Sequence, residues 1–207
     1  MSITPYSYTT VRLNSASAYL WPVVISKIEG LNLVDKRAFD LGCGNGATAN
    51  MLYAHGFAVS GVDPSESGVA IANQKFPYLR IEHGSTDDDL AAKYGKFPLV
   101  ISLEVLSHCY SANRFVRTCF DLLEPGGTLI VSAPYHSYLK NLALSIANRW
   151  DFHHKSVSDG EHIKFFSVAT LRGLLEINGL KDIRFFRVGR IPIFAKSMMA
   201  IARGPLI

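Results

Sequence analysis

The stretch Asp40–Ala47, DLGCGNGA, lies between a short apolar run and a segment with helical spacing. Its glycines let the backbone turn tightly and come close to a ligand, which the amides of the following helix would also face. Read as G-x-G-x-x-A, the stretch fits the dinucleotide-binding fingerprint, with Asp63 about 20 residues further on to hold ribose hydroxyls. The pattern predicts a strand–turn–helix unit that binds a ligand at the turn.

Strand and helix patterns alternate around this loop. Strands are expected at Arg37–Leu41, Phe57–Val62, Leu79–His83, Leu99–Leu103 and Thr128–Ser132, and helices at Ala47–His55, Ser65–Lys75 and Ala112–Leu123. Such alternation with short turns is typical of βαβ units with right-handed crossovers. We therefore predict an α/β fold with a doubly wound, mostly parallel sheet, which binds ligands beyond the carboxyl ends of its strands.

The flanking segments complete a seven-stranded sheet in a single domain, 1–207. An N-terminal helix is expected over Val11–Gly30, interrupted at Pro22. After the cofactor-binding core, 35–133, the alternation stops, and 134–166 is expected to form a lid or acceptor insertion. The remaining elements expected are a helix at Leu139–Asn148, a helix at Ser167–Asn178 with Gly179 as its C-cap, a strand at Ile183–Val188 and a last edge strand at Met198–Ala202.

Composition excludes several classes of protein. A chain of 207 residues with 48% hydrophobic and 18% charged residues is globular. The net charge of +4 comes from scattered Lys and Arg, so no nucleic-acid partner is expected. The three cysteines are an odd number without zinc-ligand spacing, which favours a reducing compartment. The sequence shows neither a signal-peptide pattern nor a run of about 18 apolar residues, so we expect a cytoplasmic protein.

The residues around the glycines favour one kind of ligand. Asp40 lies two residues before the first glycine, where a carboxylate would face an ammonium group more favourably than a pyrophosphate. No Arg or Lys accompanies the loop to offset phosphate charge. The segment Gly61–Ser65, GVDPS, ends the second expected strand with Asp63 in place. These features favour a ligand with an ammonium group over one with a pyrophosphate.

Four segments in this order carry a family resemblance: DLGCGNG at 40–46, GVDPS at 61–65, LEVLSH at 103–108 and LEPGGTLIVSAP at 123–134. They resemble the class I S-adenosylmethionine-dependent methyltransferases, and most of all the O-methyltransferases of ubiquinone synthesis and their relatives. The segment 162–180, HIKFFSVATLRGLLEINGL, is also similar to these enzymes. The resemblance implies a Rossmann-like methyltransferase fold and S-adenosyl-L-methionine as the cofactor.

The resemblance also implies how this chain would hold the methionine part of the cofactor. The backbone of Gly42 and Gly44 would lie against it, with Asp40 near its amino group. Leu103 would offer its carbonyl oxygen to the same ammonium group. Arg12 lies where the quinone enzymes use an arginine to hold the methionine carboxylate, although a solvated arginine on a helix face is an equal alternative.

The nucleoside part would be held by residues that follow the second and third strands. Asp63 would accept hydrogen bonds from both ribose hydroxyls. Pro64 would flank the adenine ring, and Ser85 and Thr86 would meet its edge. Relatives often have Asp where Ser85 stands.

The segment after the fourth strand holds the candidate catalytic residues, Glu104 and His108. With Ser107 they stand at i, i+3 and i+4, so they share a face if this turn is helical. In the quinone O-methyltransferases the segment resembles E-x-x-E-H and binds a divalent cation. Ser107 replaces the second glutamate, and a neutral hydroxyl is a poor ligand for such an ion, so no metal is expected. Either His108 acts as general base, oriented by Glu104, or the two residues only stabilise the start of a helix.

The expected acceptor is a small molecule or a lipid-like compound, methylated at oxygen. The aromatic-rich insertion fits an acceptor with an aromatic or apolar surface. Residues 138–150 carry an apolar face that either packs on the domain or makes peripheral contact with a membrane. The alternatives are a nucleic-acid methyltransferase, although no Asn/Asp-Pro-Pro-Tyr segment follows the fourth strand, and a nicotinamide-dependent oxidoreductase, which rests on the G-x-G-x-x-A reading.

Overall fold

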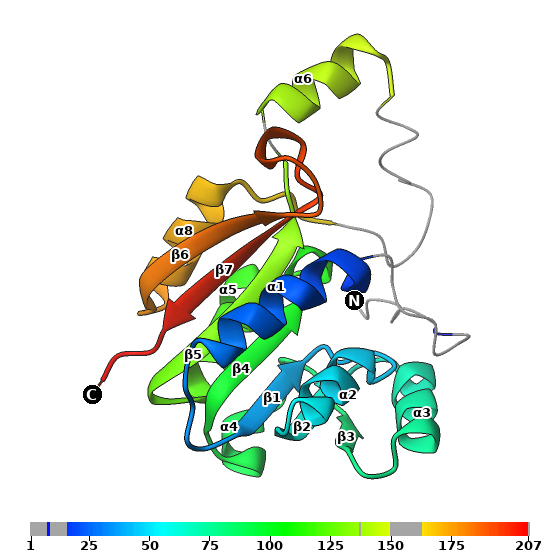
Figure 1. Cartoon of the computed structure of the whole chain (residues 1–207), viewed down its shortest axis with the longest axis vertical. Helices are drawn as coiled ribbons and strands as arrows, with labels where there is room; N and C mark the ends of the chain where they lie inside the picture. Colours follow the sequence, from blue (N-terminus) through cyan, green and yellow to red (C-terminus); the bar gives the residue numbers. More distant parts are fainter. Residues whose placement is uncertain (1–7, 9–15, 137, 150–162, 207) are drawn as a thin grey trace.

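A seven-stranded sheet with the order β3-β2-β1-β4-β5-β7-β6 forms the centre of the computed structural model, which describes residues 8, 16–136, 138–149 and 163–206 (Figure 1). The strands are β1 (Arg37–Leu41), β2 (Ala58–Asp63), β3 (Arg80–His83), β4 (Phe97–Leu103), β5 (Leu123–Pro134), β6 (Lys181–Val188) and β7 (Ser197–Arg203). Strands β1 to β5 are parallel, whereas β7 is antiparallel to both β5 and β6. The predicted doubly wound, mostly parallel sheet is confirmed.

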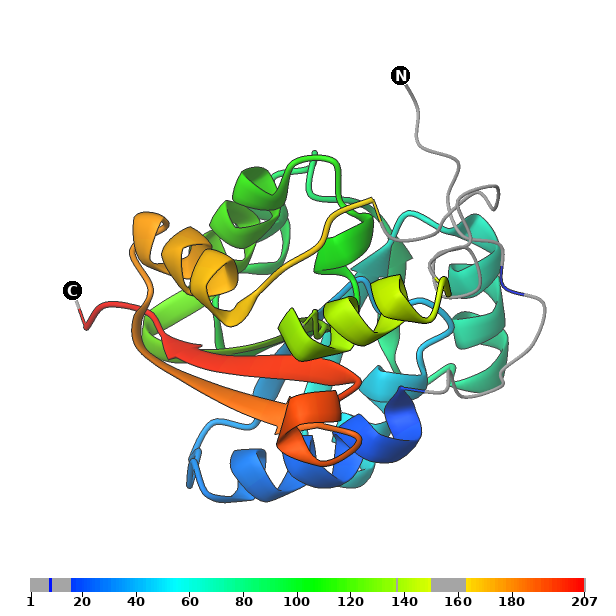
Figure 2. The same ribbon diagram turned by 90° about the horizontal axis from the view of Figure 1, so that it is seen from above.

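Helices cover both faces of this sheet. They are α1 (Ser17–Glu29), α2 (Ala47–Ala54), α3 (Glu66–Lys75), α4 (Leu90–Tyr94), α5 (Ala112–Asp121), α6 (Tyr138–Ile146) and α8 (Val168–Ile177), with short 3₁₀ turns η1 (Leu106–His108) and η2 (Pro192–Phe194). Figure 2 shows α1 on one side of the sheet and α5 and α8 on the other. Because both faces are covered, β4 is mostly apolar, as expected for a central parallel strand. Its one polar side chain, Ser102, is buried and donates a hydrogen bond to the Leu41 carbonyl at 2.6 Å.

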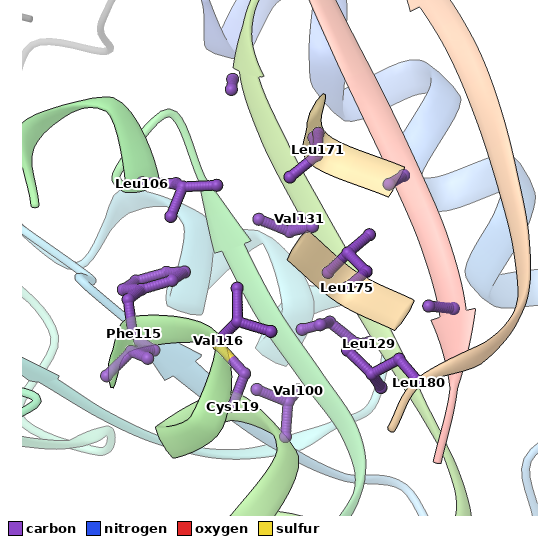
Figure 3. Close-up of a cluster of buried hydrophobic side chains, with 14 of the residues drawn as sticks. Val100, Leu106, Phe115, Val116, Cys119, Leu129, Val131, Leu171, Leu175 and Leu180 are labelled. Atoms are coloured by element: carbon purple, nitrogen blue, oxygen red, sulfur yellow. The ribbon is translucent and has the colours of Figure 1, made fainter. Parts of the chain in front are cut away.

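Two apolar cores result, one on each face. On one face, Phe115 and Val116 of α5 and Leu171 and Leu175 of α8 pack over β4 and β5, and all four side chains are fully buried (Figure 3). On the other face, α1, α2 and α3 form a second core with side chains from strands β1 to β7. Figure 3 shows Val100 pointing into the first core, whereas its neighbours Leu99 and Ile101 belong to the second. The alternation along β4 therefore anchors both layers.

Local capping chemistry sets several helix ends, and of these caps Ser65 was predicted from the sequence. The Ser65 hydroxyl accepts a hydrogen bond from the Gly68 N–H at 3.2 Å and caps α3. Ser167 caps α8 in a reciprocal pair with Thr170. The C-cap of α8 is Asn178, one residue before the predicted Gly179. Gly179 has a φ of 88°, where an L side chain would be strained.

The predicted edge position of Met198–Ala202 is wrong. This segment forms β7, which lies inside the sheet between β5 and β6, so that β6 is the edge strand. The physical reason is burial, since Met198, Met199 and Ala200 are completely inaccessible to solvent. An edge strand would leave part of this apolar surface in water.

Several further elements differ from prediction. Helix α1 continues through Pro22 because Leu20, Val24 and Ile28 bury one face against the sheet, which outweighs the lost hydrogen bond. Leu123 begins β5 instead of ending α5. Helix α4 was not predicted and begins at an Asp89 cap. The predicted lid stays a prediction, because 137 and 150–162 lie outside the described residues.

Candidate active site

The glycine loop connects β1 to α2 at the carboxyl edge of the sheet. The Gly42 and Cys43 N–H groups both donate to the Val62 carbonyl, at 2.9 and 3.1 Å, which ties the loop to the end of β2. Gly42 has a φ of 81°, and a Cβ there would lie 2.5 Å from Cγ2 of Val105. Only glycine therefore fits. Through this contact the glycine loop packs against the loop after β4, at the point where the strand order reverses.

Asp63, the last residue of β2, joins two backbone segments. Its Oδ2 accepts a hydrogen bond from the Gly44 N–H at 2.8 Å, and its Oδ1 accepts one from the Ser65 N–H, also at 2.8 Å. The residue is 7% exposed. Burial raises the pKa of Asp63, while these two backbone donors oppose the shift. The carboxylate is thus held rigidly where β2 meets the glycine loop.

Asp40 lies beside Asp63, near the end of β1, and is buried. Its carboxyl group accepts a backbone hydrogen bond from Ala49, but its Oδ2 has no hydrogen-bond partner among the described residues. Burial, together with the charge of Asp63, raises the pKa of Asp40 to about 8. A buried carboxyl group with an unused oxygen fits a cationic ligand group, which would supply both the missing hydrogen bond and the compensating charge.

The residues expected near an adenine lie on two loops of the same edge. Pro64 follows β2 and is exposed. In the loop after β3, the half-buried Ser85 donates its N–H to Asp88 at 2.7 Å, and its hydroxyl accepts from the Asp87 N–H at 3.0 Å. The Thr86 carbonyl accepts a hydrogen bond from Arg114 at 3.0 Å. Hydrogen bonds therefore fix both Ser85 and Thr86 in the loop after β3. Arg12 lies outside the described residues.

Glu104 follows β4 in an unusual backbone conformation, with a φ of 62°. Its Oε1 accepts a hydrogen bond from the Ser132 hydroxyl at 2.7 Å, and its N–H donates to the same hydroxyl at 2.9 Å. A non-glycine residue in the left-handed region is strained, and such strain is concentrated at functional sites. Ser132 on β5 holds Glu104 in this position.

The expected helical face shared by Glu104, Ser107 and His108 does not form. Glu104 has left-handed backbone geometry, and only Leu106–His108 forms a 3₁₀ turn. Ser107 is completely buried, and its hydroxyl has no hydrogen-bond partner among the described residues, whereas Glu104 and His108 are half-buried. The described parts of the chain contain no group of three or more His, Cys, Asp or Glu side chains placed to hold a metal ion.

Three residues near Glu104 were not predicted from the sequence. Besides Ser132, they are Tyr19 of α1 and Ser197 of β7, whose hydroxyl groups lie 2.9 Å apart. Burial raises the pKa of Tyr19, the bond to Ser197 opposes this shift, and the charge of Glu104 adds to it. The only sequence signal was the serine that ends the apolar run TLIVS; Tyr19 and Ser197 are 178 residues apart and carry none.

Comparison with known proteins agrees with this fold. The sequence pattern of the methyltransferase domain family matches residues 15–184. A ubiquinone biosynthesis O-methyltransferase from Caulobacter sp. (strain K31) is 36% identical over 121 residues, which cover 56% of this chain and 46% of that relative. One from Coxiella burnetii is 27% identical over 164 residues, 77% of this chain and 70% of the relative. The chain thus spans about half the length of the Caulobacter relative.

Solved structures show the same fold. Magnesium protoporphyrin IX methyltransferase from Synechocystis PCC 6803, determined with bound S-adenosylhomocysteine, superposes with a TM-score of 0.67 at 23% identity and covers 95% of this chain and 90% of its own. A methyltransferase in complex with the Trm112 activator of Haloferax volcanii gives a TM-score of 0.64 at 16% identity, covering 87% and 88% of the two chains. Since the family pattern spans most of the chain and the fold agrees, the chain belongs to the S-adenosylmethionine-dependent methyltransferases.

Proposed function

We propose that this chain transfers a methyl group from S-adenosylmethionine to an oxygen atom of a small-molecule or lipid-like acceptor. The observation that carries the proposal is the buried Asp40 carboxyl group, whose unused oxygen lies beside the backbone-anchored Asp63 at the switch in strand order. Transfer to oxygen and an apolar acceptor are supported by the relatives, which are O-methyltransferases of ubiquinone biosynthesis.

The residues of the carboxyl edge would divide the cofactor between them. Asp40 and the carbonyl of Leu103 would hold its ammonium group, and the backbone of Gly42 and Gly44 would lie against the methionine chain. Asp63 would accept from the ribose hydroxyls. The remaining contacts proposed are Pro64, Ser85 and Thr86 with adenine, and Arg12 with the methionine carboxylate. When bound, S-adenosylmethionine supplies a methyl group that its sulfonium already activates.

The residues after β4 would act on the acceptor. Methyl transfer is an in-line displacement, so the protein must align the acceptor oxygen, exclude water and remove a proton. We assign proton removal to His108. Glu104 would orient the acceptor hydroxyl or His108 from the position in which the Ser132 hydroxyl holds it at 2.7 Å.

Binding and turnover test this function directly. Calorimetry with S-adenosylhomocysteine and with NAD separates a methyltransferase from an oxidoreductase, because only the first has a site for the methionine part. Labelled cofactor should then be offered with phenolic, lipid and nucleic-acid acceptors. We expect label transfer to a phenolic or lipid acceptor. Binding of NAD without binding of S-adenosylhomocysteine would refute the proposal. Label transfer to nucleic acid alone would show that the acceptor is a nucleic acid and not a small molecule or lipid.

Removal of the Asp63 carboxylate should weaken cofactor binding. Asp63→Ala should cost about 1.5–3 kcal/mol of binding free energy, the contribution of a hydrogen bond to a charged group. The measurement is the Kd for S-adenosylhomocysteine by calorimetry. Asp121→Ala is the matched control, since Asp121 makes an ion pair with Arg117 at 3.1 Å on α5. Equal affinity of Asp63→Ala and the control would contradict the ribose assignment.

Methyl transfer should not depend on a divalent cation. The position that would supply a second carboxylate is Ser107, which is neutral and completely buried. We expect turnover to be the same with EDTA as with added Mg²⁺. Loss of activity in EDTA and its recovery with Mg²⁺ would show that this assignment is wrong.

Helix α6 and the turn η2 support contact with a lipid surface. Leu142 and Ile146 of α6 are 40% and 78% exposed, and Ile191 and Phe194 around η2 are 65% and 45% exposed. α6 lies next to η2, beyond the carboxyl ends of β4 and β5 (Figures 1 and 2). The segments 138–149 and 187–197 contain five Lys or Arg and no Asp or Glu. Such a surface favours anionic lipid.

Co-sedimentation with vesicles tests this contact. Leu142→Asp should reduce binding to vesicles that contain phosphatidylglycerol, because it places a charge on the apolar face of α6. Val34→Asp is the matched control, since Val34 is fully exposed in the loop between α1 and β1, at the opposite end of the sheet. Absence of binding by the unmodified chain would rule out the membrane contact. None of the described helices is long and apolar enough to cross a bilayer.

A further inference from the structure

Tyr8 lies against the glycine loop, although it is 36 residues away from Gly44 in the sequence. Its hydroxyl group is in contact with the Cα face of Gly44, so that no Cβ would fit there. Its ring also covers Gly68 in the first turn of α3, where a Cβ would lie 2.9 Å from Cδ2 of the ring. The Tyr8 N–H donates to the Ser67 hydroxyl at 3.0 Å. Tyr8 therefore touches two separate segments of the cofactor-binding edge.

These are the same two segments that Asp63 joins. Asp63 accepts from the N–H groups of Gly44 and Ser65, while Tyr8 contacts Gly44 and, through Ser67 and Gly68, the start of the same helix. The Ser67 hydroxyl is also within 3.0 Å of the helix-capping hydroxyl of Ser65. The bare Cα atoms at positions 44 and 68 leave room for an aromatic ring at this junction. The ring thus packs on the two backbone segments that the Asp63 carboxylate joins.

We propose that Tyr8 is a cofactor-binding residue that covers the ribose side of the pocket, which rests on the proposed function. An aromatic ring over this junction excludes water from the hydrogen bonds between Asp63 and the ribose hydroxyls, and such bonds are stronger in a dry environment. The lack of a side chain at Gly44 and Gly68 leaves the space that the Tyr8 side chain occupies.

The test compares Tyr8→Ala and Tyr8→Phe by calorimetry with S-adenosylhomocysteine and with methylthioadenosine, which keeps the nucleoside but lacks the amino acid. Tyr8→Ala should raise the Kd of both ligands about tenfold, because the Tyr8 ring covers the nucleoside that the two ligands share. Tyr8→Phe keeps the ring and should stay within about threefold of the unmodified chain. Tyr78→Ala is the control, since Tyr78 is 53% exposed and packs against Tyr53 on the surface of the domain.

If Tyr8 had only a structural role, its replacement would change the stability of the chain and not the affinity for ligands. In that case Tyr8→Ala would lower the melting temperature of the ligand-free chain and leave both Kd values unchanged, which would overturn the proposal. Tighter binding by Tyr8→Ala would also overturn it, because the ring would then obstruct the pocket. A loss of affinity for S-adenosylhomocysteine alone would show that Tyr8 acts on the amino-acid part of the ligand, and would refute its placement on the ribose side. Failure of the unmodified chain to bind S-adenosylhomocysteine would instead refute the proposed function.

Discussion

Replacement of His108 by alanine is expected to lower methyl-transfer turnover by about 10²–10⁴-fold, the contribution that a positioned general base makes to proton transfer. The affinity for S-adenosylhomocysteine should stay within about twofold, because we assign His108 to proton removal from the acceptor and not to cofactor binding. The measurements are steady-state kinetics and calorimetry on the same preparation.

His55→Ala is the matched control for this prediction. His55 is exposed at the end of α2, where its ring bonds to the Met51 carbonyl at 2.8 Å. We expect its turnover to equal that of the unmodified chain. Turnover of His108→Ala equal to that of His55→Ala would remove the general-base assignment and leave the alternative that Glu104 and His108 only stabilise this turn.

Replacement of Asp40 by asparagine should weaken S-adenosylhomocysteine binding by on the order of a hundredfold, because the ammonium group of the ligand would lose its buried counter-charge. The same change should raise the melting temperature of the ligand-free chain at pH 8. The reason is that an asparagine side chain has no charge to bury, whereas Asp40 must ionise in a dry environment beside Asp63. Opposite effects on affinity and stability distinguish this role from a general loss of structure.

The pH dependence gives a second, independent check on Asp40. Its pKa in the folded, ligand-free chain is about 8, above the ordinary 3.8. The contribution of Asp40 to the free energy of unfolding is therefore fully present below pH 3.8 and is lost as the pH rises through about 8. Binding of an ammonium group favours the ionised carboxylate, so affinity should rise with pH up to about 8 and binding at pH 7 should release a proton.

Calorimetry in buffers of different ionisation enthalpy measures that proton release. Asp40→Asn should bind without it, and its melting temperature should lack the decline that the unmodified chain shows towards pH 8. Proton release that is the same in both proteins would assign the titrating group elsewhere and contradict the ammonium contact.

Local signals made much of the fold predictable. The alternation of apolar strands with capped helices predicted the parallel half of the sheet, because strand burial and helix capping depend mainly on nearby residues. The position of β7 was not predictable from its own composition. A short apolar segment gives the same sequence pattern whether its strand lies inside the sheet or at its edge, and only pairing with both β5 and β6 decides the order.

The candidate site divides in the same way. The positions of Asp40, Gly42 and Asp63 at the carboxyl edge could be predicted from the sequence, because each stands at or near the end of a strand and strand ends gather at one edge. The backbone geometry after β4 could not be predicted from the sequence. The spacing of Glu104 and His108 suggested a shared helical face, but the backbone of Glu104 turns into the left-handed region instead.

By itself, the sequence determined that this chain has a glycine loop, two acids at strand ends and a methyltransferase-like order of segments. These depend on backbone freedom and on residues near one another in the chain. Only the tertiary structure decided that Ser132 holds Glu104, that Tyr8 covers Gly44 and Gly68, and that the apolar face of α6 is exposed beside η2. Each of these depends on contacts between distant segments, which no local pattern encodes.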